Sequence, residues 1–118
     1  MLNAIRNAIL GRPQDKPIKA AGLKRSPQWP TVRKKHLEKN PMCAVCGVTK
    51  DVQVHHKKPF HLNPALELDQ TNLISLCDEN SHDCHIIFGH LSDWSSFNAD
   101  VQEDADRMRE KIKTRPKT

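Results

Sequence analysis

The hydrophobic residues of this chain follow a helical period near its C-terminal end. Four of them recur three or four positions apart and predict an amphipathic helix: Val101, Ala105, Met108 and Ile112. Asp100 and Glu103 have the spacing of a capping box, so this helix is expected to begin at Asp100. An earlier helix is expected to begin at Ser26-Pro27 or at Trp29-Pro30 and to end before Asn40-Pro41.

The middle of the chain has the patterns of two strands and a short helix. Asp51–His56 alternates between apolar and polar residues, and Leu73–Cys77 is a short apolar run, so both predict strands. The stretch 57–71 contains two prolines and no sustained period, which predicts a long ordered loop. A short helix is expected from about Asp83 to Gly89. The fold class predicted from these elements is a small α+β domain flanked by N- and C-terminal helices.

The length and composition allow one small domain with a thin core. The chain has 118 residues, with three Phe, two Trp and no Tyr, so a disulfide or metal staple is expected. The sequence predicts that residues 1–25 are a basic arm and linker, in which residues 2–10 could form a short helix. Residues 26–118 are predicted to form the domain. No signal peptide or membrane-spanning run is expected, which indicates a cytoplasmic, reducing setting. Such a setting favours four cysteines bound to metal over two disulfides.

Positive charge is concentrated in one part of the sequence. Residues 12–40 hold nine Lys or Arg and two acidic residues, whereas residues 41–92 hold three basic and six acidic residues. The remaining residues, 93–118, are balanced at six and six. This distribution predicts nucleic-acid contact beside the site, although a solvated basic arm would have the same composition. The predicted contact residues in this stretch are Arg33, Lys34 and Lys35.

Four cysteines form two closely spaced pairs. Cys43-x2-Cys46 has the spacing of a zinc knuckle, and Gly47 permits its tight turn. Cys77-x6-Cys84 is wider than usual. The interpretation is a structural Zn²⁺ bound by all four thiolates. Two alternatives remain at this stage: a histidine, His82 or His85, replaces one thiolate, or the four cysteines are free thiols.

Six of the seven histidines lie within 36 residues: His55, His56, His61, His82, His85 and His90. The order of His55-His56, Asn72, Cys77 and Cys84-His85 resembles the HNH endonuclease family over about residues 42–90. This resemblance implies a ββα-metal core, in which a hairpin and a helix hold one divalent ion, with a four-cysteine zinc knuckle beside it.

The resemblance also implies roles for the histidine pair. By position, His56 corresponds to the general base and His55 to a ligand of the catalytic metal. Asn72 corresponds to the residue that orients the base through a hydrogen bond. Adjacent residues of a regular strand point to opposite faces, so a bend or strand end is expected at the pair, with Pro59 close by.

The helical ligands are expected to come from the short segment after Cys84. His85 corresponds to the second ligand of the catalytic ion. A third ligand usually lies about one helical turn later, where this chain has Gly89, and His90 is one residue further. Five residues turn about 140° on an ideal α-helix, so His90 can be a ligand only if the helix end is distorted.

These residue types suit phosphodiester hydrolysis. A neutral imidazole can accept a proton near neutral pH, and a divalent ion, Mg²⁺, Mn²⁺, Ni²⁺ or Zn²⁺, can act as Lewis acid. Lys57 and Lys58 follow the pair and are expected to hold flanking phosphates. His61 is expected either at the edge of the site or as a solvated loop residue.

The predicted function is a metal-dependent endonuclease that nicks or cuts double-stranded DNA with low sequence specificity. Small free-standing members of the family are often encoded by phages and mobile elements, in DNA packaging, restriction or homing, so partners in DNA processing and the host cytoplasm are expected. The alternative function is a non-catalytic zinc module that binds nucleic acid or a protein through its basic stretch. Neither the oligomeric state nor the choice between nicks and double-strand cuts follows from the sequence.

Overall fold

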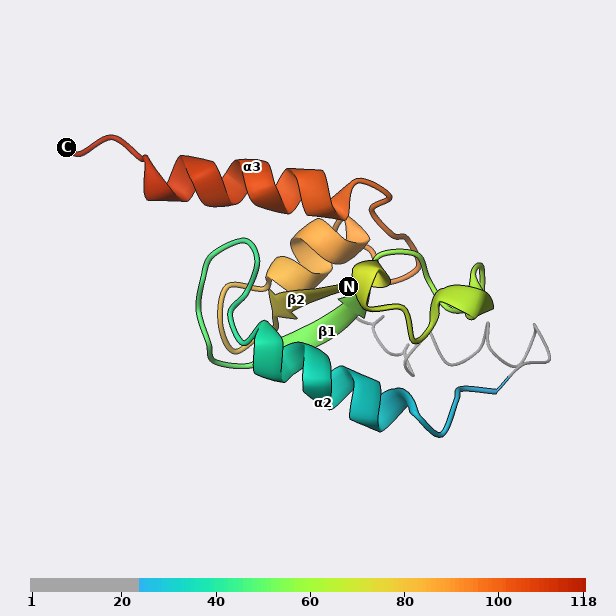
Figure 1. Cartoon of the computed structure of the whole chain (residues 1–118). Helices are drawn as coiled ribbons and strands as arrows, with labels where there is room; N and C mark the ends of the chain where they lie inside the picture. The colour runs from blue at the N-terminus through green and yellow to red at the C-terminus, as the bar shows by residue number, and fades with distance from the viewer. Residues whose placement is uncertain (1–23) are drawn as a thin grey trace.

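The computed structural model describes residues 24–118. They form a small α+β domain with a two-stranded antiparallel sheet (Figure 1). The domain also contains a four-cysteine cluster. The expected helix over residues 2–10 and nearly all of the basic arm lie outside the described residues. The main elements, in chain order, are α2 (Trp29–Lys39), β1 (Val52–His56), β2 (Leu73–Cys77), the π-helical segment η3 (His85–Gly89) and α3 (Val101–Lys113).

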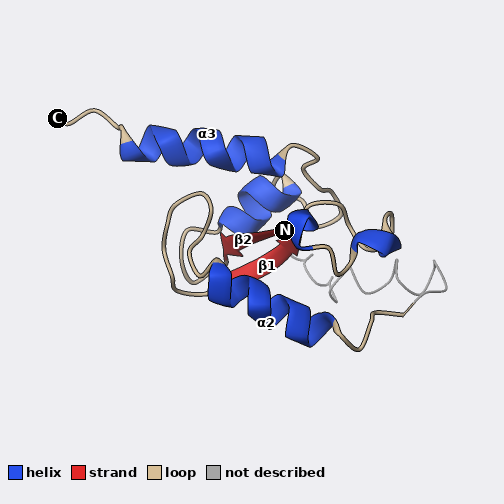
Figure 2. Cartoon of the chain, in the orientation of Figure 1, coloured by secondary structure: helices blue, strands red, loops and turns tan. Residues whose placement is uncertain are grey.

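The sheet is packed between helices on its two faces. β1 and β2 pair antiparallel, with Val52 opposite Cys77 and His56 opposite Leu73. Both strands contact α2 and both contact η3, and α3 in turn covers η3 (Figure 2). All five residues of β2 are therefore buried, which explains its continuous apolar run. The two predicted strands are confirmed, β1 starting one residue later than expected.

Helix α2 begins at Trp29, which is the second of its two expected starts. The first, at Ser26-Pro27, lies before the helix. The Ser26 hydroxyl accepts a hydrogen bond from the Gln28 amide at 3.0 Å, which makes a turn before the helix. Pro30 lies in the first helical turn, where its missing N–H is not needed. The helix ends at Lys39, and its buried residue is His36.

The capping box predicted for α3 is not formed. The helix does begin at Val101, but the side chain of Asp100 makes no capping hydrogen bond. The buried Asn98 instead accepts from the Asp100 amide at 2.9 Å and donates to Asp104 at 2.8 Å. Asn98 also donates to the Phe88 carbonyl at 3.0 Å, so it joins the start of α3 to η3.

The core lies between the cysteine cluster, β2 and α3. Its buried members are Cys43, Val45, Ile74, Leu76, Cys77, Cys84, Val101 and Ala105. The predicted apolar face of α3 is confirmed, since Met108 and Ile112 pack against this cluster. None of the helices within residues 24–118 is long and apolar enough to cross a membrane.

Candidate metal centres and the adjoining pocket

The four cysteines converge on one point. Cys43 and Cys46 lie in the turn before β1, Cys77 ends β2, and Cys84 directly precedes η3. All four are free thiols, and their sulfurs lie within 4.8 Å of one another. The sulfurs of Cys46 and Cys77 are 3.7 Å apart. With Zn–S bonds of about 2.3 Å, two ligands of a tetrahedral zinc ion are about 3.8 Å apart, so this spacing fits zinc.

Neither a disulfide nor a histidine ligand fits the cysteine cluster. A disulfide would need sulfurs about 2.05 Å apart, far closer than the 3.7 Å between Cys46 and Cys77. His82 is exposed, and His85 belongs to a separate cluster, so neither replaces a thiolate. The Cys84 thiol hydrogen-bonds to Cys43 and lowers the pKa of Cys43, which favours a thiolate in the cluster. The same contact, followed by burial, raises the pKa of Cys84.

The knuckle turn is held in place by α3. Gly47 has a left-handed backbone, with φ of 84°, and its amide donates to the Cys43 carbonyl at 3.0 Å. A Cβ at this glycine would lie 2.7 Å from Nη1 of Arg109. The Arg109 guanidinium fills this space and donates to the Cys46 carbonyl at 3.3 Å. Gly47 is therefore needed both for the turn and for the close approach of α3.

Three histidines form a second cluster, separate from the cysteines. Ligand nitrogens of His55, His85 and His90 lie within 4.8 Å of one another. Nε2 of His85 is 3.2 Å from Nδ1 of His55. Nitrogens bound to one ion at about 2.1 Å would be about 3.0 Å apart in octahedral and about 3.4 Å apart in tetrahedral geometry. The observed spacing would also suit one hydrogen bond between two rings, but the third imidazole favours a metal site.

His90 reaches the cluster because η3 is a π-helix. On an ideal α-helix, His90 would point about 140° away from His85. The π-helical hydrogen-bond pattern, from residue i to i+5, brings a residue five positions later back toward the same face. The distortion required for His90 is thus present. It ends with Leu91 and Ser92 in left-handed conformations, with φ of 55° and 66°, and such strained residues are typical of functional sites.

The surroundings of the three rings leave nitrogens directed toward a common ion. Nδ1 of His90 donates to the Ser96 carbonyl at 2.8 Å, which leaves the lone pair on Nε2. The Asp78 carboxylate lies 3.9 Å from Nδ1 of His85, on the opposite side of that ring from Nε2. Carboxylates and carbonyls behind ligand imidazoles are characteristic of metal sites.

His55 is the most buried of the three rings. Burial, and then the proximity of His85, His90 and His56, hold the pKa of His55 well below its ordinary value, so the ring is neutral. Within residues 24–118, its Nε2 is buried and has no hydrogen-bond partner. Nε2 is not the nitrogen that faces His85, which is Nδ1, so the neutral ring can bind an ion through Nδ1. The donor set therefore fits a divalent metal.

Gly89 provides the space that the His55 ring occupies. A Cβ at this position would lie 3.1 Å from Cε1, 3.2 Å from Nε2 and 3.3 Å from Nδ1 of His55. We expect Gly89→Ala to displace the ring by a few tenths of an ångström and to weaken divalent-metal binding about 10-fold. Ile87→Ala, at a side chain that is 47% exposed on the same segment, is the matched control and should bind metal normally.

Tryptophan fluorescence can measure this change in affinity. The ring of Trp94 lies 4.7 Å from that of His90 and 5.3 Å from that of His85. The other tryptophan, Trp29, lies against His56. A metal titration should change the emission of wild type and of Trp29→Phe, and Trp94→Phe should remove most of the signal. Equal affinities of wild type and Gly89→Ala would contradict the predicted role of the glycine.

His56 points to the other face of the sheet, toward α2. Strand pairing continues regularly through both histidines and β1 ends at His56, so of the bend or strand end expected at the pair the structure has the strand end. The His56 ring lies 4.5 Å from the Trp29 ring, and its Nε2 is 2.9 Å from the Glu67 carbonyl. Because a carbonyl only accepts, Nε2 carries the hydrogen and Nδ1 the lone pair. Burial lowers the pKa of His56, the Glu67 carbonyl opposes this, and the Arg25 charge lowers it further.

Asn72 does not hydrogen-bond directly to His56, as the resemblance implied. Its Oδ1 accepts from the Lys58 amide at 2.9 Å, and its Nδ2 donates to the carbonyls of Lys58 and Leu66 at 3.1 and 3.3 Å. Asn72 is buried, and its hydrogen bonds tie the loop after β1, at Lys58 and at Leu66, to the start of β2. Leu66 is followed by Glu67, whose carbonyl contacts His56. Any influence of Asn72 on His56 therefore passes through the backbone.

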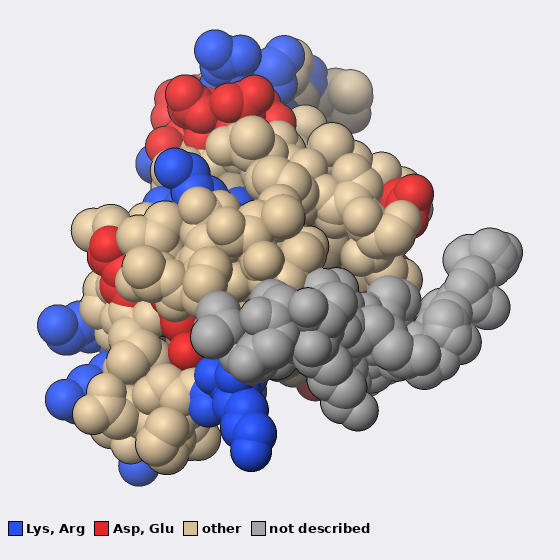
Figure 3. Space-filling view, turned by 90° about the vertical axis from the view of Figure 1, so that its right-hand side faces the viewer, with Lys and Arg blue, Asp and Glu red and all other residues tan. Residues whose placement is uncertain are grey.

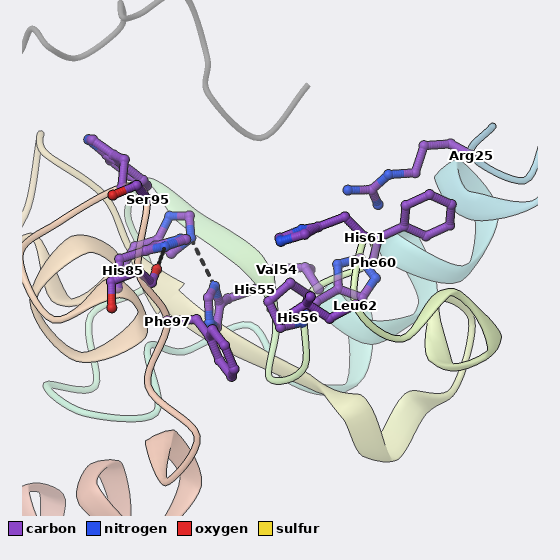
Figure 4. Close-up of a pocket in the computed structure, with 14 residues that line it drawn as sticks. Arg25, Val54, His55, His56, Phe60, His61, Leu62, His85, Ser95 and Phe97 are labelled. Carbon is purple, nitrogen blue, oxygen red and sulfur yellow. Dashed lines mark hydrogen bonds between the residues drawn. The ribbon is translucent and has the colours of Figure 1, made fainter. Parts of the chain in front are cut away.

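A pocket of about 380 Å³ joins the two histidine positions (Figure 4). His55, His85 and His90 line it together with His56, so the strand directs two neighbouring rings to different parts of one cavity. The exposed His61 lies at its edge. The predicted nucleic-acid contacts are not among its lining residues: Lys57, Lys58, Arg33, Lys34 and Lys35.

Sequence reasoning missed several residues of this site. Arg25 lines the pocket although it was counted only as part of the basic stretch, and Trp94 lines it beside the histidine cluster. Glu67 was not singled out, yet it is buried and contacts both Arg25 and His56. An acidic residue between Leu66 and Leu68 was the one available signal.

Comparisons of the chain with protein-family models, with curated proteins and with solved structures give no match. The positions of the side chains are accordingly the basis of the functional assignment.

Proposed function

We propose that this protein is a metal-dependent endonuclease of the HNH type. The observation that carries the proposal is the single pocket that holds a three-imidazole cluster and His56. The two antiparallel strands and the following helical segment are compatible with a ββα-metal core, and the cysteine cluster supplies a separate zinc site. A plain zinc knuckle would have no need of the second cluster.

The proposed chemistry follows from the orientation of these residues. His56 has its lone pair on Nδ1 and a lowered pKa, so it can accept a proton from water near neutral pH. A divalent ion held by His55, His85 and His90 would act as Lewis acid on the phosphate and on the leaving oxygen. The Glu67 carbonyl fixes the ring of His56, and Asn72 fixes the backbone on both sides of that loop.

The ligand set favours some ions over others. The three candidate ligands are all imidazoles, and Asp78 lies behind His85 and not among them. Imidazole suits Zn²⁺ and Ni²⁺ better than Mg²⁺, which prefers oxygen ligands. We therefore propose that Zn²⁺ or Ni²⁺ binds the site more tightly than Mg²⁺ or Mn²⁺.

DNA is the proposed substrate because basic residues flank the pocket along the chain. Residues 24–40 contain six Lys or Arg and one acidic residue. In the space-filling view, Lys and Arg form separate groups at the top, at the left and near the bottom of the face shown, with Asp and Glu beside the top group and mostly uncharged residues between (Figure 3). Separate groups suit contacts with phosphates spread along a duplex, which position DNA without reading its sequence. Lys57, Lys58, Arg33, Lys34 and Lys35 are proposed for these flanking contacts.

A plasmid assay tests the proposed function. Purified protein should nick supercoiled plasmid only when a divalent ion is added, with activity at lower concentrations of Ni²⁺ or Zn²⁺ than of Mg²⁺. The triad variant His85→Ala should lose the activity, and His82→Ala, at an exposed histidine three residues earlier, should keep it. DNA binding that weakens with salt, without cleavage under any metal, would instead support the non-catalytic zinc module.

A further inference from the structure

We propose that Arg25 binds the scissile phosphate, opposite the histidine cluster. This inference deepens the proposed function and rests on it. Arg25 is the one Lys or Arg among the residues lining the pocket within the described chain, 24–118. It lies in the segment before α2, far in sequence from the residues of the predicted site. In Figure 4 its guanidinium points toward the cavity, across from His55 and His85.

The position of Arg25 is fixed by a buried carboxylate. Nη1 of Arg25 lies 3.8 Å from Oε2 of Glu67, a residue with only 5% of its surface exposed. The two carboxylate oxygens of Glu67 also accept from the Ser26 amide, at 3.1 and 3.2 Å. The backbone beside Arg25 is therefore anchored as well as its side chain.

An aromatic ring packs against the same guanidinium. The central carbon of the Arg25 guanidinium lies 4.6 Å from the centre of the Phe60 ring, a cation–π contact. Phe60 is 4% exposed, so this support is rigid. The Arg25 side chain nevertheless remains 34% exposed, and it lines the pocket. A planar cation that is both held and accessible is well suited to bind a phosphate.

Glu67 connects Arg25 to the proposed base. Its side chain holds Arg25, whereas its backbone carbonyl fixes Nε2 of His56. One residue thus sets the positions of two groups in the pocket. The alternative is that the Arg25–Glu67 pair only attaches the segment before α2 to the domain. That structural role predicts lower stability without a specific effect on phosphate.

A small phosphodiester separates these roles. Bis(4-nitrophenyl) phosphate lacks flanking nucleotides, so only groups at the scissile phosphate can affect its hydrolysis. We expect Arg25→Gln to lower kcat/KM about 100-fold on both this diester and plasmid DNA, as does the loss of a charge-stabilising donor in other enzymes. Arg25→Lys, which keeps the charge but not the planar fork, should lose about 10-fold.

Three controls accompany these variants. Lys24→Gln removes a neighbouring exposed charge that does not line the pocket, and it should leave diester hydrolysis unchanged. The double variant Lys34→Gln/Lys35→Gln should weaken only DNA cleavage. The metal affinity of Arg25→Gln, measured through Trp94 fluorescence, and its melting temperature should match those of wild type.

The outcomes are distinct. Wild-type diester hydrolysis by Arg25→Gln, or a loss confined to DNA, would overturn the assignment to the scissile phosphate. If Arg25→Gln has a lower melting temperature, and its activity falls only as far as this loss of folded protein explains, the structural role is established instead. If wild type hydrolyses neither substrate, the proposed function fails; the binding of inorganic phosphate to the metal-loaded protein then still tests Arg25, because Arg25→Gln should weaken it.

Discussion

His56→Ala is expected to abolish plasmid nicking while zinc binding and the fold survive. The ring contacts Trp29 and the Glu67 carbonyl, and it does not belong to either metal cluster. Its loss removes the proposed general base, and general-base catalysis contributes about 10²- to 10⁴-fold. Single-turnover nicking at saturating metal should therefore slow by about that factor, with zinc content and Trp94-monitored metal affinity unchanged.

His61→Ala is the matched control for this variant. His61 lines the same pocket but is exposed, and the proposed chemistry gives its ring no role. It should retain most of the wild-type rate. If His56→Ala nicked plasmid as fast as His61→Ala and wild type, His56 would not be the base, and the proposed mechanism would have to assign the proton to another group.

Removal of zinc is expected to unfold the domain and thereby eliminate the histidine cluster. The four sulfurs tie together three segments: the turn before β1, the end of β2 and the start of η3. Structural zinc contributes about 10–16 kcal/mol of apparent binding free energy in small zinc domains, comparable with the whole stability of about 5–15 kcal/mol typical of a domain. A strong chelator should therefore abolish the cooperative melting transition seen by circular dichroism.

Cysteine variants check the same prediction without a chelator. Cys84→Ser should reduce bound zinc and prevent Trp94 from responding to a second metal, because Cys84 directly precedes His85. His82→Ala should bind zinc as wild type does, since His82 lies outside the cluster. A Cys84→Ser protein with full zinc content and a wild-type melting temperature would show that this thiol is not a structural ligand.

The local elements of this protein could be predicted from its sequence because their signals are local. The run Leu73–Cys77 is found as β2 with the predicted bounds, and the apolar period of α3 matches its packing on the core. The capping box was wrong, since the Asp100 side chain makes no capping hydrogen bond and Asn98 instead links the start of α3 to η3 through Asp104 and Phe88. The spacing of Asp100 and Glu103 in the sequence gives no information about these contacts of Asn98.

The two clusters were predicted unequally well. The cysteine set was correctly grouped, since two short-spaced pairs leave few other arrangements for a small chain. His90 was the least certain member of the histidine set, and its place depends on a π-helical distortion that no spacing rule predicts. Of the bend or strand end expected at His55-His56, the structure has the strand end, and the two rings reach one pocket without a bend between them.

By itself, then, the sequence determined which residue types were available: four thiols, a closely spaced set of imidazoles, and the strands and helices that carry them. Only the tertiary structure decided which of them meet. It separated His55 from His56, replaced a direct Asn72–His56 contact with a backbone link, and brought Arg25 to the pocket, where it pairs with Glu67 from 42 positions away in the chain. Such contacts depend on how α2 and the loop after β1 pack together, and that packing is a property of the whole domain.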